Sequence, residues 1–176
     1  MRCKRGLVFC LAMVSVAVTW LGTGLATVGL GAELWIGAAT TNITPDRPVA
    51  LSGQMHTRIA KEVESPVTAT AVALESRQNG KSVDQAVMVS CDLVSIAEEV
   101  RQQLRQRLKG RLRDFDPDKL FLSATHTHTA PVLEEGKYHL PKEGVIQPAE
   151  YVQFLVERLS EVVSKAWEGR KEGAVG

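Results

Sequence analysis

The sequence of 176 residues predicts an α/β fold with a mixed, partly parallel sheet and crossover helices, in an incomplete domain. Residues 67–92 contain two strand-like runs joined by a hairpin signal, and residues 85–124 follow the order strand, helix, strand. A hairpin makes its strands antiparallel, whereas a strand–helix–strand unit makes them parallel. The last apolar helical segment is followed by only a few residues, so we expect the domain to be cut short.

The N-terminal region has the composition of a targeting segment. Arg2, Lys4 and Arg5 precede an uncharged, largely apolar stretch that continues to Ala32. A basic start, an apolar core and a small-residue exit are typical of a secretory signal peptide, so we expect residues 1–32 to be removed on export. An uncleaved membrane anchor is the alternative, because the uncharged span is long enough to cross a bilayer. The expected location is secreted or periplasmic, or membrane-anchored if the segment is retained.

The remaining residues, 33–176, are expected to form a globular domain. The whole chain is 44% hydrophobic and 23% charged with a net charge of +1, so no basic surface for nucleic acid is indicated. Cys91 is the one cysteine after the predicted signal, so no disulfide can form within the exported part. Its apolar surroundings in the sequence predict a buried, inert thiol. Stability is therefore expected to come from the core or from a metal.

The first half of the domain is predicted to be mainly strands. Residues 34–45 read as a strand that ends at a Pro-Asp turn, and residues 46–66 read as a long loop with several breakers. Alternation over residues 67–76 and an apolar run over residues 85–92 predict two further strands. The Asn-Gly pair between them is a hairpin signal, so these two strands are expected to pair antiparallel.

A helix is predicted where the apolar residues from Ala97 onward change to a spacing of three and four. Ser95 and Glu98 are expected to form a capping box at its start. Residues 119–124 read as the next strand, which completes a crossover unit. An irregular loop then leads to Pro148, which opens a second helix with a broad apolar face. No further strand is expected after this helix.

Two histidines follow the strand at residues 119–124, within the segment SATHTHTAP. Side chains at i and i+2 of an extended segment point to the same side, so His126 and His128 are expected to reach one site. Asp92 ends the neighbouring strand, and ligand sites of open α/β sheets lie at the carboxyl ends of the strands. Because neutral imidazole is a common zinc ligand, one ring could bind a metal while the other contacts substrate or a bound water.

A histidine pair alone also fits a polar strand end with a structural or surface role. A zinc site needs at least three protein ligands. His56 and His139 lie in irregular segments and are expected to be surface residues. Helical zinc motifs, G-x-S-x-G, the P-loop and G-x-G-x-x-G are absent from the sequence. The residues by themselves therefore leave both interpretations open.

The amino-acid sequence of the histidine segment resembles that of a known family. SATHTHTAP resembles the SATHTHSGPG motif of the neutral/alkaline (non-lysosomal) ceramidases. Three earlier segments resemble the same family in the same order, namely IGAATTNITP, LSGQMHTRIAKEVESPVTATAVALE and VMVSCDLVSI. The resemblance runs from about Leu34 to the C-terminus and corresponds to the beginning of the family's catalytic domain. Residues 33–176 are therefore predicted to be the N-terminal portion of such a domain.

The resemblance implies a zinc-dependent amidohydrolase that hydrolyses the N-acyl bond of ceramide to a fatty acid and a sphingoid base. It implies that His126 is a metal ligand for Zn²⁺ and that His128 is a catalytic residue beside the metal. It also implies a ceramide-like lipid substrate, with contact to a membrane surface through that substrate. The family's other zinc ligands lie downstream of the matching region, so we expect the chain alone to be inactive.

The segment also departs from the family motif. Thr129, Ala130 and Val132 replace a Ser and two Gly, and Asn42 stands where the family has Asp. Loss of glycine restricts the backbone, so the loop after His128 is expected to follow a different path. Two other interpretations remain. One is a non-catalytic exported binding module or decayed relative, and the other is a phosphoesterase-type metal hydrolase that uses the histidine pair with Asp92.

Overall fold

The structure is a computed structural model that describes residues 31–174. The predicted signal peptide lies almost wholly outside the described residues. The elements are β1 (Glu33–Asn42), β2 (Val49–Leu51), β3 (Arg58–Ala60), β4 (Thr68–Gln78), β5 (Lys81–Cys91), α1 (Glu98–Arg111), the 3₁₀ helix η1 (Pro117–Lys119), β6 (Leu120–Ala124), α2 (Pro148–Glu168) and β7 (Lys171–Gly173). Within residues 31–174, none of the helices has the length and apolar character needed to span a membrane.

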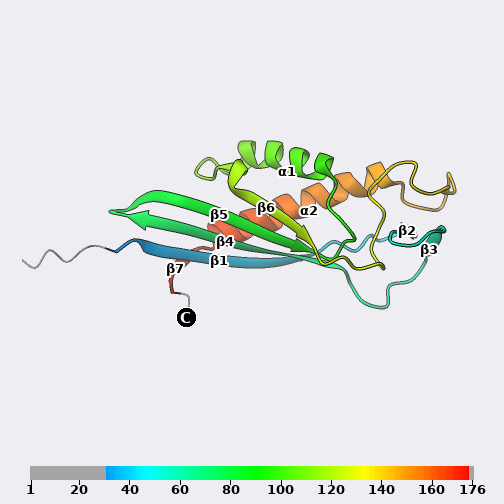
Figure 1. Ribbon diagram of the computed structural model, residues 1–176, viewed down its shortest axis with the longest axis horizontal. Coiled ribbons are helices and arrows are strands. Elements are labelled where there is room, and N and C mark those ends of the chain that lie inside the picture. Colours follow the sequence, from blue (N-terminus) through cyan, green and yellow to red (C-terminus); the bar gives the residue numbers. More distant parts are fainter. Residues whose placement is uncertain (1–30, 175–176) are drawn as a thin grey trace, which may run out of the picture.

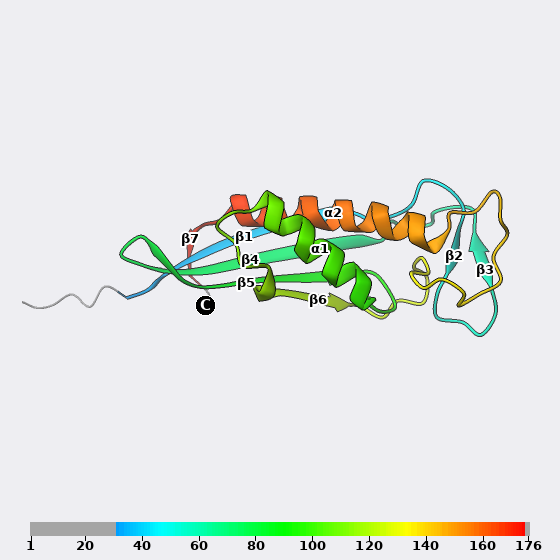
Figure 2. The same ribbon diagram turned by 90° about the horizontal axis from the view of Figure 1, so that it is seen from above.

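Five strands form one sheet in the order β6-β5-β4-β1-β7. Strands β5 and β6 are parallel and are joined through α1, whereas the other neighbouring strands are antiparallel. Both α-helices lie on the same face of this sheet (Figures 1 and 2). The predicted α/β class with a mixed, partly parallel sheet and a crossover helix is confirmed.

Small side chains on the covered face let helix α2 lie close to the sheet. Ala69, Ala71 and Ala73 alternate along β4 and are fully buried. At Gly37 of β1 a Cβ atom would lie 2.0 Å from the carbonyl oxygen of Ala166, so only glycine permits this approach. The helix completes the core with its own buried face, which includes Tyr151, Leu155, Leu159, Val162, Val163 and Trp167.

The turns and helix ends agree in part with those predicted from the sequence. Asn79 and Gly80 have φ values of 53° and 72°, the conformation of a tight hairpin turn, so the predicted hairpin is confirmed. The predicted capping box is wrong, because α1 begins at Glu98 with Ala97 as its N-cap and without a side-chain cap. Glu98 and Glu99 instead place negative charge beside the free N–H groups of the first turn.

The prediction that no strand follows the second helix is wrong. Strand β7 turns back after α2 and pairs antiparallel with the free edge of β1, where Ile36 lies opposite Lys171. The strand has three exposed residues, so it carries no alternation of buried and exposed side chains that would predict a strand.

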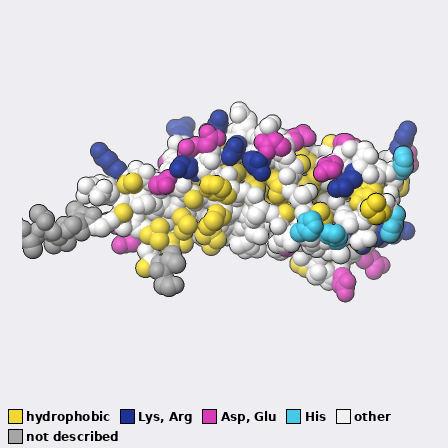
Figure 3. Space-filling model, in the orientation of Figure 1, with side chains coloured by type: hydrophobic (Ala, Val, Ile, Leu, Met, Phe, Trp, Pro, Cys, Tyr) yellow, Lys and Arg dark blue, Asp and Glu magenta, His cyan; other side chains and the backbone are white. Residues whose placement is uncertain are grey.

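A second, small sheet occupies the segment predicted to be a loop. Strands β2 and β3 pair antiparallel, and single bridges join Leu51 to Pro131 and Val49 to Ile146. We call residues 43–67 together with residues 125–147 the end lobe. It lies beyond the carboxyl ends of β5 and β6 (Figure 1). Histidine side chains gather at this end of the molecule, away from the apolar patch over the strands (Figure 3).

Candidate functional site

The candidate site begins where the two parallel strands end. Cys91 of β5 and Ala124 of β6 lie side by side in register, and the N–H of Thr125 donates to the carbonyl oxygen of Cys91 at 2.9 Å. Both strands end at this point, and Asp92 follows the end of β5 while His126 follows the end of β6. This arrangement confirms that these segments meet at one edge of the sheet, as expected for parallel neighbours.

His126 has an unusual backbone conformation and an oriented ring. Its φ is 64°, in the left-handed region that few residues other than glycine adopt. Its Nδ1 lies 2.8 Å from the carbonyl oxygen of Val94. Since a carbonyl oxygen only accepts, Nδ1 is the donor, and in the neutral ring Nε2 then keeps a free lone pair. The side chain is exposed, so Nε2 is available to a ligand.

The rings of His126 and His128 lie together, with centroids 5.0 Å apart and planes at 68°. The expectation that both rings reach one place is confirmed. The reason given for it was wrong, because the left-handed φ of His126 interrupts the extended segment on which the i, i+2 rule depends. An uncommon backbone conformation held at a candidate site is consistent with a functional constraint.

Within the end lobe, residues 52–58 contact the segment that carries His128. Gly53 has a φ of 95°, and a Cβ atom there would lie 2.5 Å from Cγ of His128, so the imidazole packs directly on the glycine backbone. Arg58 donates from Nη2 to the carbonyl oxygen of His128. The N–H of Ser52 donates to the carbonyl oxygen of Ala130 at 2.9 Å. His128 is therefore contacted by β3 and by the turn between β2 and β3.

Gly53 and Arg58 did not emerge as site residues from the sequence. The one available signal was the Gly in a segment of turn-forming residues, which indicated a turn without indicating what it touches. The bond from Arg58 joins residues 70 positions apart, and nothing in the local pattern predicts it.

Asp92 lies at this edge, but its carboxylate forms hydrogen bonds within the fold. Its Oδ2 accepts from the N–H and from the hydroxyl of Thr68, each at 2.9 Å, and its Oδ1 accepts from the Thr125 hydroxyl at 3.3 Å. These bonds join β4, β5 and the segment after β6. The phosphoesterase interpretation, which needs Asp92 as a metal ligand, therefore lacks a free carboxylate at this position.

The chain supplies a limited set of metal ligands. Among residues 31–174, no three or more His, Cys, Asp or Glu side chains come close enough to hold a metal ion. His56 and His139 are exposed, in agreement with the expected surface role. Cys91 is fully buried, which confirms the predicted buried thiol, and burial together with the charge of Asp92 raises its pKa to about 12.

Comparisons with known proteins connect this fold to one group of enzymes. No family model matches the chain, and no curated protein sequence matches it significantly. The crystal structure of neutral ceramidase from Pseudomonas aeruginosa is similar over 81% of this chain, with a TM-score of 0.64 and 20% identity. A ceramidase complexed with C2 is similar over the same share, with a TM-score of 0.62 and 18% identity. The chain has a ceramidase-like fold and spans 22% of the length of each neighbour.

Proposed function

We propose that this chain is the N-terminal part of the catalytic domain of a zinc-dependent amidohydrolase related to the neutral ceramidases. The reaction is hydrolysis of the N-acyl bond of a ceramide-like lipid, which gives a fatty acid and a sphingoid base. The observation that carries this proposal is the pair of adjacent imidazoles at the carboxyl ends of two parallel strands, within a ceramidase-like fold. The SATHTHTAP segment supports the same assignment.

His126 is the proposed metal ligand, through Nε2. A ligating histidine commonly donates its other N–H to a carbonyl or carboxylate, which fixes the tautomer and the ring. The contact between Nδ1 and the Val94 carbonyl has this form. When bound, zinc supplies a Lewis acid and a water whose pKa is lowered toward ~7. Further ligands would have to come from outside residues 31–174.

His128 is the proposed catalytic residue beside the metal. Its ring lies 5.0 Å from that of His126 and packs on Gly53, and Arg58 donates to its backbone carbonyl oxygen. A positioned imidazole in this place can hold a proton and pass it to a leaving amine. The contact with Gly53 restricts the positions open to the ring, which favours general acid–base catalysis.

We also propose that the protein is exported and meets its substrate at a membrane surface. The apolar segment that precedes the described residues supports export, with cleavage near Ala32 or retention as an anchor. A ceramide-like substrate resides in membranes, so contact with a membrane surface follows from the proposed reaction.

Zinc stoichiometry and amide hydrolysis test the proposal, measured on the full chain and on any longer product of the same locus. We expect weak, substoichiometric zinc on the chain itself and hydrolysis of an N-acyl sphingoid base by a longer product. His126→Ala should abolish that hydrolysis, whereas His56→Ala, at an exposed histidine of the same lobe, should not. Hydrolysis that survives His126→Ala would overturn the assignment, and a longer product without any hydrolysis would favour a binding module.

A further inference from the structure

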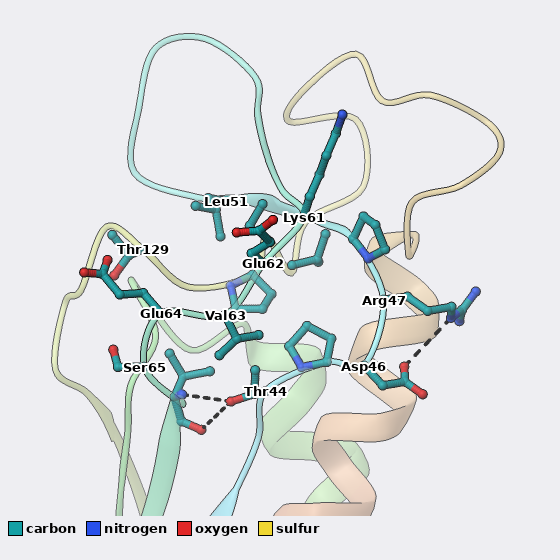
Figure 4. A pocket seen from close by; sticks show the side chains of 16 residues that line it. Thr44, Asp46, Arg47, Leu51, Lys61, Glu62, Val63, Glu64, Ser65 and Thr129 are labelled. Carbon is teal, nitrogen blue, oxygen red and sulfur yellow. Dashed lines mark hydrogen bonds and ion pairs between the residues drawn. The ribbon is translucent and has the colours of Figure 1, made fainter.

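A cavity of about 330 Å³ lies within the end lobe (Figure 4). Strands β2 and β3 contribute to its walls, together with the segments that follow β1 and β3. Its apolar lining includes Pro45, Val49, Leu51, Val67 and Pro131. Hydrogen bonds between Thr44 and the backbone of Val67 close one end of the lining.

Five of the residues that line this cavity are charged, and they carry both signs: Asp46, Arg47, Lys61, Glu62 and Glu64. Lys61, Glu62 and Glu64 belong to an exposed segment, and Arg47 pairs with Glu150 on helix α2. The lining therefore has no concentrated positive charge for an anion. No aromatic residue lines the cavity, so there is no platform on which a sugar or a base would stack. The apolar part of the lining can pack against flexible aliphatic groups, and the charged residues can contact a polar end of the same molecule.

The cavity adjoins the histidine segment. Thr129 lines it and directly follows His128, and its hydroxyl lies 2.9 Å from that of Thr127. Figure 4 shows Thr129 on one wall and Arg47 on the opposite wall. Val63, in the segment that follows β3, lines the cavity and is 58% exposed, so the cavity is open to solvent beside it. A chain held here would have one end beside the segment that carries the proposed catalytic residue.

We propose that this cavity binds one unbranched hydrocarbon chain of the lipid whose amide bond is presented to His126 and His128. The volume is at the lower end of the range for ligand pockets, which suits a single chain rather than a pair. This inference rests on the proposed function for the identity of the lipid. The binding of an aliphatic chain follows from the cavity alone.

Binding of cis-parinaric acid to the full chain, followed by fluorescence below its aggregation concentration, tests the cavity directly. We expect saturable binding that dodecanoate displaces and butyrate does not. Ala60→Phe, in β3, and Val63→Trp, in the segment after β3, add bulk at two positions of the lining, and Val63 is exposed enough that its variant should fold. Each should weaken displacement by dodecanoate about tenfold, because excluding two methylene groups costs roughly that factor.

Val83→Phe is the matched control. Val83 is 61% exposed in strand β5 and does not line the cavity, so this variant should bind dodecanoate like the parent chain. Absence of saturable binding, or equal displacement from the parent and both filled variants, would overturn the proposal. Hydrolysis measured separately on a longer product distinguishes the two inferences. Binding of the hydrocarbon chain without hydrolysis would contradict the proposed function but support the proposed role of the cavity. Hydrolysis without binding of the chain would support the proposed function and contradict the proposed role of the cavity.

Discussion

The Nδ1 atom of His126 lies 2.8 Å from the carbonyl oxygen of Val94, in the connection between β5 and α1. His128, two residues later, is instead held by Gly53 and Arg58 of the end lobe. The two histidines thus contact different parts of the fold, Val94 outside the end lobe and residues 53–58 within it, and we expect their 5.0 Å ring separation to depend on both. Changes in the end lobe should therefore move one histidine relative to the other.

Gly53→Ala tests this dependence. The new Cβ would lie 2.5 Å from Cγ of His128 at a φ of 95°, so we expect the ring of His128 to be displaced and the free energy of unfolding to fall by about 2–3 kcal/mol. Urea unfolding measures the loss, and the imidazole resonances of His126 and His128 report the displacement.

The control for this variant is Gly144→Ala. Gly144 also has a positive φ, 74°, but a Cβ there would meet nothing within 4 Å. It should cost about 1 kcal/mol through backbone strain and leave both imidazoles unchanged. Equal effects of the two substitutions would show that Gly53 is required for its backbone conformation and not for contact with His128.

Glu75 predicts an acid-dependent stability. Burial raises its pKa, but hydrogen bonds from Arg77 and Ser82 and the charges of Arg170 and Arg77 lower it more, so the net pKa lies below its ordinary value. A folded-state pKa below the unfolded one stabilises the fold above the unfolded pKa of about 4.3. This stabilisation is lost as the pH falls through the folded-state pKa.

Glu75→Gln should therefore destabilise the fold by about 3 kcal/mol at pH ~7 and make it less sensitive to acid, because two arginines lose their shared carboxylate. Urea unfolding across pH ~3 to ~7 measures both effects. Glu64→Gln, at an exposed carboxylate, is the control and should follow the parent profile. Parallel profiles for the parent chain and Glu75→Gln would contradict this account.

Cys91 should resist thiol reagents in the folded chain. Its side chain is fully buried and its pKa is raised to about 12, so little thiolate forms at pH ~8. Labelling with Ellman's reagent should require unfolding, and its rate should rise with urea. The Cys91→Ala variant is the control, because its labelling shows how much of the signal comes from the other cysteines. Rapid labelling of Cys91 without denaturant would show that its strand opens readily.

The sequence predicted those features whose cause is local. Residues 67–92 contain both strand patterns and their Asn-Gly turn, so the hairpin could be predicted. Strands β2, β3 and β7 have three residues each, too few to show a period, and their pairing is decided by distant partners. The capping box failed because the helix starts at Glu98, the second member of the motif, rather than directly after Ser95.

The candidate site shows the same division. The place of His126 and His128 after a strand predicted that they lie together, but the i, i+2 rule used for it does not apply here. The left-handed φ of His126 could not be predicted, because nothing in its neighbours requires it. The contacts that hold His128 come from Gly53 and Arg58, far away in the sequence, and depend on the folded end lobe.

The tautomer of His126 tests the central claim most directly, by ¹⁵N NMR of the imidazoles at alkaline pH, where free imidazole is neutral. The account predicts that Nδ1 of His126 carries the proton and that added Zn²⁺ shifts the Nε2 resonance, even if binding is weak. A proton on Nε2, with no response to Zn²⁺, would contradict the assignment of His126 as a metal ligand.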